Sequence, residues 1–435
     1  MSNRRDFLKA TSASLLAAEL VGDELLADPR PLPRAAPPAT LHPAEPVRMA
    51  VIGTGGMGTE HCRAILKLCK DGKTDARIEA LCDVCQPRLA AAKKIVDEAQ
   101  AGVSGGDGDV AAYTDYRELL ARPDLHGVLI ASPEHWHQQM AEDAIEAGKD
   151  VYVEKPMTLR LKQAIRLWDV QRKNPQVIVN VGTQYVMTPS YRVARQLIAE
   201  GAIGKPVWSQ TGYCRNSKDG EWLYYAIDPA WQPGVNLDWK RWCGPLGEAP
   251  WDPEVYARWR RYRRYSTGII GDLLVHQMSP LIMAIGLGWP IRVTAAGGHY
   301  VDKKMENHDQ VNLTIEFEDE HTMIVAGSTA NELGLETLIR GHKGNIYLGG
   351  RIAILRPERL YAEELEERTI PGEDLGDAQD QLRLGWLECI RSRAAPPSPV
   401  ELGVKVMVIV DLATRSMWEG KAFGYDPAKR KVRKL

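Results

Sequence analysis

The 435-residue sequence predicts an α/β protein with two domains: a doubly wound parallel sheet, then an α+β domain with a large open, mainly antiparallel sheet. Two observations predict this fold class. Between residues 47 and 187, short apolar runs alternate with stretches of helical period, which is typical of parallel strands covered by helices on both faces. From 188 to 435 this alternation stops, and several runs alternate apolar and polar residues, as strands with one solvated face do.

The first domain is expected to repeat strand and helix in order. In such sheets the connections are right-handed, and ligands bind at the carboxyl ends of the strands. Glycine-rich residues 101–109 are expected to form a loop. The expected strands are 47–53, 77–84, 127–132, 150–154 and 176–184, and the expected helices are 57–70, 86–100, 136–147 and 160–173.

A glycine-rich turn joins the first strand to the first helix, and it consists of Gly53, Thr54, Gly55, Gly56, Met57 and Gly58. The first glycine of such a turn permits a tight bend, the second lets the backbone approach a pyrophosphate, and the last lets helix pack on strand. The helix N–H groups then face the phosphates. Asp83 ends the second strand, where a carboxylate can bind ribose hydroxyls and repel a 2′-phosphate. The pattern predicts a Rossmann-type domain that binds NAD in preference to NADP.

The second domain is expected to begin with a helix over 189–201 and a strand over 205–213. The irregular stretch 216–265 follows, and it is too long to be an idle connection. Together with Trp208 it is rich in tryptophan, and these rings are expected either to stack on a pyranose face or to pack an oligomer interface. Later strands are expected over 291–298, 311–317, 321–328, 336–341 and 345–348, and helices over 378–393 and 404–419.

The composition is that of an ordinary globular protein, with 44% hydrophobic and 26% charged residues. The net charge of −2 gives no electrostatic reason to expect nucleic acid or an anionic membrane as a partner. The aromatic residues are 12 Trp and 15 Tyr against 3 Phe, a usage that suits a wet, sugar-like ligand. Seven cysteines, an odd number, do not indicate a full disulfide framework.

Residues 1–27 resemble a twin-arginine export signal, with Arg4 and Arg5 followed by Phe7-Leu8-Lys9. The weakly apolar stretch behind them is too short and too polar to cross a bilayer, so no stable membrane insertion is expected. Residues 28–46 are rich in Pro and Ala and are expected to form a flexible linker. A periplasmic or otherwise exported protein is predicted, or a cytoplasmic one if the signal is not used.

Three residues distant in the sequence, Lys155, Asp272 and His276, are the predicted catalytic residues. Lys155 follows the strand 150–154, and Pro156 forces it into an extended conformation through a bond that could be cis or trans. Asp272 and His276 lie four apart and would share one face of a helix. Histidine suits proton abstraction near neutral pH, and an ammonium can stabilise charge developing on oxygen. Together they predict hydride transfer at a hydroxyl-bearing carbon.

In their order, these motifs resemble the Gfo/Idh/MocA family of oxidoreductases, which includes glucose–fructose oxidoreductase and inositol dehydrogenase. The resemblance covers Val47 to the C-terminus and implies that the lysine, aspartate and histidine line the substrate site beside the nicotinamide. It implies a homo-oligomer, a dimer or tetramer, with the large sheet at the interface. One departure is Ser279, where many members carry an acid. Further cofactor contacts are implied from Ser132, Pro133, His135, His137, Glu154, Lys155 and Gln184.

The resemblance implies an oxidoreductase acting on a sugar, polyol or glycoside. Because an exported enzyme meets no ready NAD pool, the cofactor is expected to stay bound and to be regenerated within the cycle. Either a second sugar is reduced, or a glycoside is oxidised, eliminated, hydrated and reduced again. The second route needs another base, for which the segment Tyr224–Asp228 is a candidate. A non-catalytic sugar-sensing protein on the same fold is the rival hypothesis.

Two further patterns are given structural interpretations. Cys82 and Cys85 flank Asp83 without a second cysteine pair, and His135 and His137 are expected to pack or to form hydrogen bonds, so no metal site is predicted. The arginine-rich run 258–265 is expected to form salt bridges, with an anionic sugar as the alternative ligand.

Overall fold

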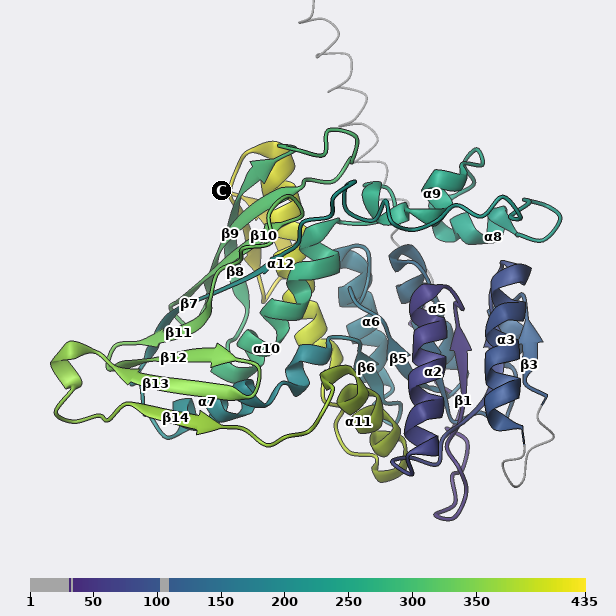
Figure 1. The fold of residues 1–435 in the computed structure, drawn as a ribbon, viewed down its shortest axis with the longest axis horizontal. Helices are drawn as coiled ribbons and strands as arrows, with labels where there is room; N and C mark the ends of the chain where they lie inside the picture. The colour runs from purple at the N-terminus through teal and green to yellow at the C-terminus, as the bar shows by residue number, and fades with distance from the viewer. Residues whose placement is uncertain (1–30, 33, 102–108) are drawn as a thin grey trace, which may run out of the picture.

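The computed structural model describes residues 31–32, 34–101 and 109–435. The predicted export signal at 1–27 and most of the predicted loop at 101–109 lie outside the described residues. The described chain forms two domains that lie side by side (Figure 1). Within the described ranges, no helix has both the length and the apolar character needed to span a membrane.

The first domain is built on a six-stranded parallel sheet, which confirms the predicted doubly wound fold. Its strand order, β3-β2-β1-β4-β5-β6, changes direction between β1 and β4. The strands β4 and β5 are buried along their whole length, as parallel strands covered on both faces are. The strands are β1 (Arg48–Ile52), β2 (Arg77–Cys82), β3 (Ala111–Tyr113), β4 (Gly127–Ile130), β5 (Asp150–Val153) and β6 (Val179–Val181).

Most helices of this domain have the predicted positions: α2 (Gly56–Lys70), α3 (Gln86–Gln100), α5 (Glu134–Glu146) and α6 (Leu161–Lys173). The short β3 and α4 (Tyr116–Leu120) are missing from the prediction because each is too brief to show a period. The expected strand 176–184 is wrong at both ends. Only Val179–Val181 pair with β5, and Gln184 already begins the 3₁₀ helix η1 (Gln184–Met187).

A helix from the end of the chain, beyond the boundary expected at residue 187, packs against the first domain. This helix, α11 (Ala378–Ser392), packs Trp386 edge-on against Tyr152 of β5, with 5.7 Å between the ring centroids. Just beyond it, the Arg393 guanidinium donates to both carboxylate oxygens of Asp150, at 2.6 and 2.9 Å.

The second domain contains a ten-stranded sheet in the order β14-β13-β12-β11-β7-β10-β9-β8-β15-β16, which is antiparallel except between β7 and β10. The prediction of a large, mainly antiparallel sheet is confirmed. The last two hairpins were not predicted, since their strands are short and β14 and β16 are largely exposed. The strands are β7 (Pro206–Cys214), β8 (Pro290–Gly298), β9 (Gln310–Phe317), β10 (His321–Ser328), β11 (Thr337–Gly341), β12 (Gly344–Gly349), β13 (Ile352–Pro357), β14 (Arg368–Pro371), β15 (Phe423–Asp426) and β16 (Lys431–Lys434).

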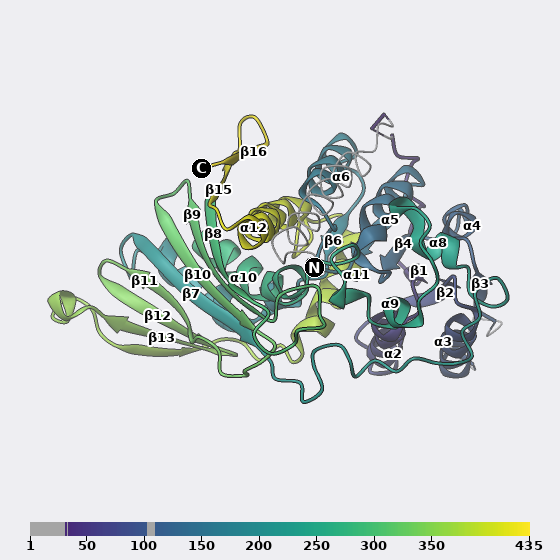
Figure 2. The ribbon, with the colours of Figure 1, turned by 90° about the horizontal axis from the view of Figure 1, so that it is seen from above.

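Helices cover one face of this sheet and leave the other open (Figure 2). They are α7 (Pro189–Ala199), α10 (Val275–Ile285) and α12 (Val400–Glu419), and the π-helical turn η4 (Ile270–Leu274) leads into α10. Along β9 and β10 buried residues alternate with residues of greater exposure, as expected for a sheet with a single covered face. Helix α12 also packs against α6, which joins the two domains.

The tryptophan-rich stretch 216–265 crosses the end of the first domain toward which β1 points (Figure 1). It carries the short helices α8 (Trp239–Cys243) and α9 (Pro253–Ala257). The carboxyl ends of the parallel strands lie at this end, so the stretch lies over the predicted ligand site.

The expected flexible linker at 28–46 is a wrong prediction for its described part, because the chain there is packed on the first domain. The Ala36 N–H donates to the Glu146 carbonyl at 2.9 Å, and the Ala35 N–H donates to Asn174 Oδ1 at 2.8 Å. The Ala36 carbonyl lies so close to Gly148 that a Cβ there would be 2.7 Å away. A composition rich in proline and alanine is compatible with an extended segment packed on the surface as well as with a flexible linker.

Candidate active site

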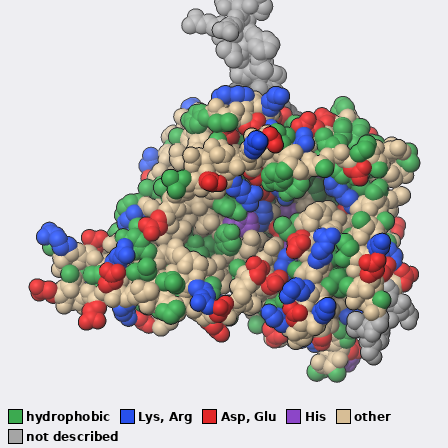
Figure 3. All heavy atoms as spheres, viewed as in Figure 1, with side chains coloured by type: hydrophobic (Ala, Val, Ile, Leu, Met, Phe, Trp, Pro, Cys, Tyr) green, Lys and Arg blue, Asp and Glu red, His purple; other side chains and the backbone are tan. Residues whose placement is uncertain are grey.

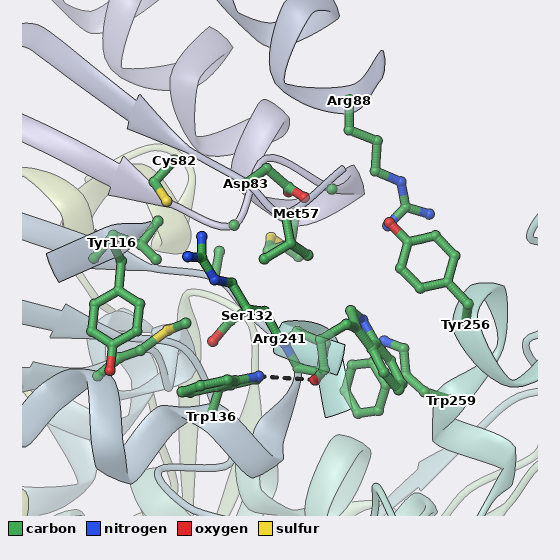
Figure 4. Close-up of a pocket in the computed structure, with 18 of the residues that line it drawn as sticks. Met57, Cys82, Asp83, Arg88, Tyr116, Ser132, Trp136, Arg241, Tyr256 and Trp259 are labelled. Atoms are coloured by element: carbon green, nitrogen blue, oxygen red, sulfur yellow. Dashed lines mark hydrogen bonds between the residues drawn. The ribbon is translucent and has the colours of Figure 1, made fainter. Parts of the chain in front are cut away.

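The glycine-rich turn forms one wall of a cleft of about 430 Å³ at the ends of the parallel strands (Figure 4). Gly53 has a left-handed backbone (φ 89°), and a Cβ there would lie 2.7 Å from the Ser132 nitrogen. A Cβ on Gly58 would lie 1.8 Å from the Gly53 carbonyl oxygen. Gly55 and Gly56 open onto the cleft, and no side chain in the described part of the chain caps the start of α2. This helix start can therefore hold a pyrophosphate.

Asp83 lies at the predicted place, in the cleft at the end of β2, and it also holds the loop together. Its Oδ2 accepts the Thr54 N–H at 2.7 Å, and its Oδ1 accepts the Cys85 N–H at 2.8 Å. Burial raises the pKa of Asp83 above its usual range, although Arg88 and these hydrogen bonds oppose the rise. Thr54 is thus oriented toward Asp83, whose side chain also lines the cleft.

Ser132 and Pro133 line the cleft as predicted, but His135 and His137 do not. His135 Nε2–H donates to the Trp242 carbonyl at 2.7 Å, beside Trp136 Nε1–H, which donates to the same oxygen at 2.9 Å (Figure 4). His137 is fixed between the carbonyl oxygens of Ser132 and Pro156, each 2.8 Å from a ring nitrogen. Both histidines thus form hydrogen bonds to the backbone, as expected from the sequence, and direct contact with the cofactor stays a prediction.

Glu154 was expected to bind the cofactor, yet it is buried behind the cleft in a chain of charged groups. The Arg383 Nε–H donates to His61 Nδ1 at 2.9 Å, which leaves His61 Nε2–H to donate to Glu154 Oε1 at 2.9 Å. The other carboxylate oxygen accepts the Lys155 N–H at 3.1 Å. Burial raises the pKa of Glu154, but the bond from His61 and the charge of Lys155 outweigh it and bring the pKa to about 2. Glu154 is therefore an anion, and its carboxylate fixes the backbone of Lys155.

The structure brings Lys155 and Asp272 together as predicted. Lys155, which precedes a cis bond to Pro156, donates from Nζ to Asp272 Oδ1 and to the Asp272 carbonyl, both at 2.9 Å. Arg260 Nε–H donates to the same Oδ1 at 2.7 Å. Burial raises the pKa of Asp272, but the two cations outweigh it and hold the pKa well below its usual range. The carboxylate thus remains charged and orients the ammonium.

His276 begins the next helical turn, with its ring near Tyr185 and Tyr213, whose ring centroids lie 5.5 and 6.1 Å away. Burial and then the charge of Lys155 lower its pKa to about 3, so the imidazole is neutral near pH 7. Its Nδ1 is buried and has no hydrogen-bond partner among the described residues. Ser279, the departure from the family pattern, donates to the Val275 carbonyl at 2.7 Å, so it does not replace the missing acid behind the ring.

Basic and histidine side chains gather in a hollow between the two domains (Figure 3). Gln184 begins η1 at the end of β6 and is half-buried, next to Tyr185. The first domain therefore supplies Lys155, the second supplies Asp272 and His276, and the cleft with the glycine turn lies beside them. The arrangement can hold a dinucleotide on one side and a hydroxyl compound on the other.

Two family models match the chain. The model described as "Oxidoreductase family, NAD-binding Rossmann fold" matches residues 47–183, and the model described as "Oxidoreductase family, C-terminal alpha/beta domain" matches residues 248–424. The chain belongs to the Gfo/Idh/MocA oxidoreductase family. Residues 184–247 lie between the matched ranges, so part of the tryptophan-rich stretch falls outside both family models.

Individual relatives are more distant. Inositol 2-dehydrogenase 1 of Saccharopolyspora erythraea is 31% identical over 161 residues, which cover 37% of this chain and 44% of that protein. The chain spans about half the length of the curated relatives it matches. An NAD binding oxidoreductase from Klebsiella pneumoniae has a TM-score of 0.65 at 22% identity, over 87% of this chain and 98% of that one. Levoglucosan dehydrogenase in complex with NADH and levoglucosan has a TM-score of 0.67 at 18% identity, over 87% and 99%. At such identities the structural likeness shows the fold alone.

Several residues at the site of this Gfo/Idh/MocA protein escaped prediction. Glu134 is fully buried beside Ser266, whose hydroxyl donates to Oε1 at 2.7 Å, and its Oε2 has no partner within the described ranges. Burial and the charge of Asp272 raise the pKa of Glu134 to about 7. Arg260 was predicted only as one of a basic run. The cleft is also lined by Arg88, Tyr225, Arg241, Trp242, Tyr256 and Trp259.

The other arginines of the run 258–265, and Cys82 and Cys85, have structural roles, as expected. Arg261 donates to Asp302 Oδ2 at 2.7 Å, and Arg264 donates to the Gly247 carbonyl at 3.0 Å, so the basic run is engaged within the chain. Cys82 and Cys85 are buried free thiols, and burial raises the pKa of each. The described ranges contain no cluster of three or more His, Cys, Asp or Glu side chains that could hold a metal ion.

Proposed function

We propose that the protein is an NAD-dependent oxidoreductase that transfers hydride at a hydroxyl-bearing carbon of a sugar, polyol or glycoside. The observation that carries the proposal is the cluster of Lys155, Asp272 and His276 beside a cleft shaped for a dinucleotide. The names of the relatives, an inositol 2-dehydrogenase and a levoglucosan dehydrogenase, agree with a polyhydroxylated substrate. When bound, the nicotinamide would accept or donate the hydride.

The residues divide the work on the hydroxyl group. The Lys155 ammonium, held by Asp272, is placed to donate a hydrogen bond to the substrate oxygen and to stabilise negative charge there. His276 is neutral and can accept the hydroxyl proton. The nearby carboxylates of Asp272 and Glu154 favour its protonated form, but burial and the charge of Lys155 outweigh them, so His276 is a weak base in the free protein.

The test is a pair of substitutions, Lys155→Ala and His276→Ala, assayed over a panel of sugars, polyols and glycosides chosen by thermal shift. A compound that binds only the folded protein raises its melting temperature. We expect both variants to bind NAD and to lose turnover by at least about 10². The matched controls are His342→Ala and Lys343→Ala in the turn between β11 and β12, which should behave as wild type. Full activity of both site variants would refute the assignment.

A non-catalytic sugar sensor on the same fold is the rival function. It predicts that sugars bind without any change in the redox state of the cofactor. If no member of the panel altered the absorbance of bound NAD or NADH near 340 nm, although several raised the melting temperature, the sensor would replace the enzyme.

We further propose that NAD is the cofactor, that it is recycled within each catalytic cycle, and that the protein is exported and oligomeric. Asp83 in the cleft supports NAD over NADP, while Arg88 beside it would accept a 2′-phosphate, so the ratio of the two dissociation constants is the deciding measurement. The Arg4-Arg5 motif supports export, and the open face of the ten-stranded sheet supports a dimer or tetramer. Protein purified without added cofactor should then contain NAD at near one per chain.

Between the two recycling routes, the site favours oxidation of one sugar and reduction of another. The glycosidase route needs a further base, and Tyr224 and Asp228, at the two ends of the segment Tyr224–Asp228, are not placed to supply one. Tyr224 is largely exposed, and its hydroxyl donates to Glu221 Oε1 at 2.9 Å. Asp228 is exposed and accepts the N–H of Ala230 in its own turn. Detection of a reduced second sugar, without release of an aglycone from any glycoside, would support this choice.

A further inference from the structure

The tryptophan-rich stretch 216–265 has a small core of its own. Trp239 and Trp242 stack with 4.7 Å between their centroids and 12° between their planes, and Tyr256 lies edge-on against both. The facing rings of Trp239 and Trp242 are buried against each other, so these two faces are not free to stack on a pyranose. The buried members of this core are Cys85, Leu237, Trp239, Trp242, Cys243, Tyr256 and Tyr265.

This stretch is anchored to two loops of the first domain. Beyond β2, the Asp238 N–H donates to the Val84 carbonyl at 3.0 Å, and the Gln86 N–H donates to the Asn236 carbonyl at 2.9 Å. Beyond β4, His135 and Trp136 both donate to the Trp242 carbonyl. These are the loops that carry Asp83 and Ser132, so the stretch is tied to the segments that would hold the dinucleotide.

The same stretch forms the outer wall of the cleft. Tyr225, Trp242, Tyr256 and Trp259 line it opposite the glycine turn. The mouth is bridged by Arg88 of α3, whose guanidinium lies 4.6 Å from the ring centroids of both Trp231 and Tyr256. Figure 4 shows Arg88 and Tyr256 facing each other across the side of the cleft where Asp83 lies. Because an acidic residue at this place binds the adenosine ribose, the bridge lies over the adenosine half of the site.

We propose that residues 216–265 are a clasp that closes over the adenosine half of bound NAD, with the Arg88–Trp231–Tyr256 bridge as its latch. The proposal rests on the proposed NAD binding and adds what retains the cofactor. To leave, the dinucleotide has to pass the aromatic wall, so the bridge must open first. Weakening the latch therefore raises the dissociation rate constant, which is where most mutational effects on a binding contact appear.

Substitution of Trp231 weakens the latch without removing a lining residue, because Trp231, unlike Arg88, does not line the cleft. We would load NADH on the full-length protein and chase it with excess NAD, following energy transfer from tryptophan to NADH. Trp231→Ala and Arg88→Met should each release NADH about tenfold faster or more, since a cation over an aromatic ring contributes on this scale. The matched control is Trp208→Ala, because Trp208 on β7 also carries an arginine over its ring (Arg340, 3.5 Å) but lies outside the cleft. It should release NADH as wild type does.

Release at the wild-type rate in both latch variants would overturn the clasp. A second measurement needs no substitution: NADH binding should slow amide hydrogen exchange throughout residues 216–265 of the wild-type protein, and exchange there that ignores NADH would also overturn it. Both outcomes differ from failure of the proposed function. That failure would appear as wild-type protein that binds no NADH at all, in which case the clasp falls with it.

Discussion

Replacing Asp272 by asparagine tests how the charged cluster is held together. The substitution keeps the shape of the side chain and removes its charge. In the wild type, Oδ1 accepts from Lys155 at 2.9 Å and from Arg260 at 2.7 Å, and the Asp272 side chain is only 6% exposed. Asp272→Asn leaves two neighbouring cations without their shared anion, and breaking a buried ion pair from one side costs about 3–5 kcal/mol.

The loss should be visible in thermal unfolding at pH 7. At about 2–4 °C per kcal/mol for domains of moderate size, we expect Asp272→Asn to melt at least about 5 °C below the wild type. The matched control is Asp71→Asn, which removes the carboxylate of an exposed pair with Lys67 and should change the melting temperature hardly at all. A melting temperature within about 2 °C of the wild type for Asp272→Asn would refute this account of the cluster.

The pH dependence gives the same prediction a second test. The pKa of Asp272 lies below its unfolded value because of Lys155 and Arg260, so its stabilisation is present above the unfolded pKa of about 4 and is lost as the pH falls. The difference in stability between the wild type and Asp272→Asn should therefore shrink below about pH 4. A difference that grew on acidification would mean that another group is responsible.

Three further outcomes are expected. The ring resonances of His276 in an NMR titration should show a neutral imidazole from pH 5 to 8, because its pKa is lowered to about 3. Below about pH 6.5 the unfolded state then binds more protons than the folded state, so the wild type loses stability. His276→Gln should remove part of that loss. Gly58→Ala should lose NAD binding in calorimetry, because its Cβ would lie 1.8 Å from the Gly53 carbonyl oxygen, whereas Gly349→Ala, with nothing in the described ranges within 4 Å, should bind normally. Glu134→Gln should have a higher melting temperature than the wild type, and the difference should be larger at pH 8 than at pH 5. The reason is that the pKa of Glu134 is raised to about 7, so the wild type loses stability as this glutamate ionises. A difference that stayed constant with pH would contradict this.

The parts of the site that could be predicted are those fixed by local backbone requirements and by short motifs. Gly53 is required by its left-handed backbone and Gly58 by its close contact with the Gly53 carbonyl oxygen, and Asp83 follows from its place at the end of β2. The two-residue period predicted most of the central strands of the second sheet. The cluster of Lys155, Asp272 and His276 was predicted by combining chemistry with family resemblance, not by any local signal.

The parts that escaped prediction depend on how distant segments pack. Glu134 resembles any acid at a helix start, and only its burial next to Asp272 changes its chemistry. His135 lies near the predicted site in sequence, but its ring nitrogen meets the Trp242 carbonyl, more than a hundred residues away. No local pattern announces such contacts, because they arise only when the stretch 216–265 docks on the first domain.

The unusual aromatic usage of this chain follows from that docking. Trp239 and Trp242 stack on each other with Tyr256 edge-on against both, and Trp242 and Tyr256 line the cofactor cleft, where aromatic side chains suit a nucleotide base and its ribose. The opposite side, around His276, presents hydroxyl groups and charge, with Tyr213 accepting a hydrogen bond from Arg215 at 2.9 Å. Because a hydroxyl-rich compound is recognised by donors and acceptors and a base by stacking, the two sides of the site match two different ligands. Recognition of the substrate should therefore respond to changes at Tyr213 and Arg215, and retention of the cofactor to changes in the aromatic wall.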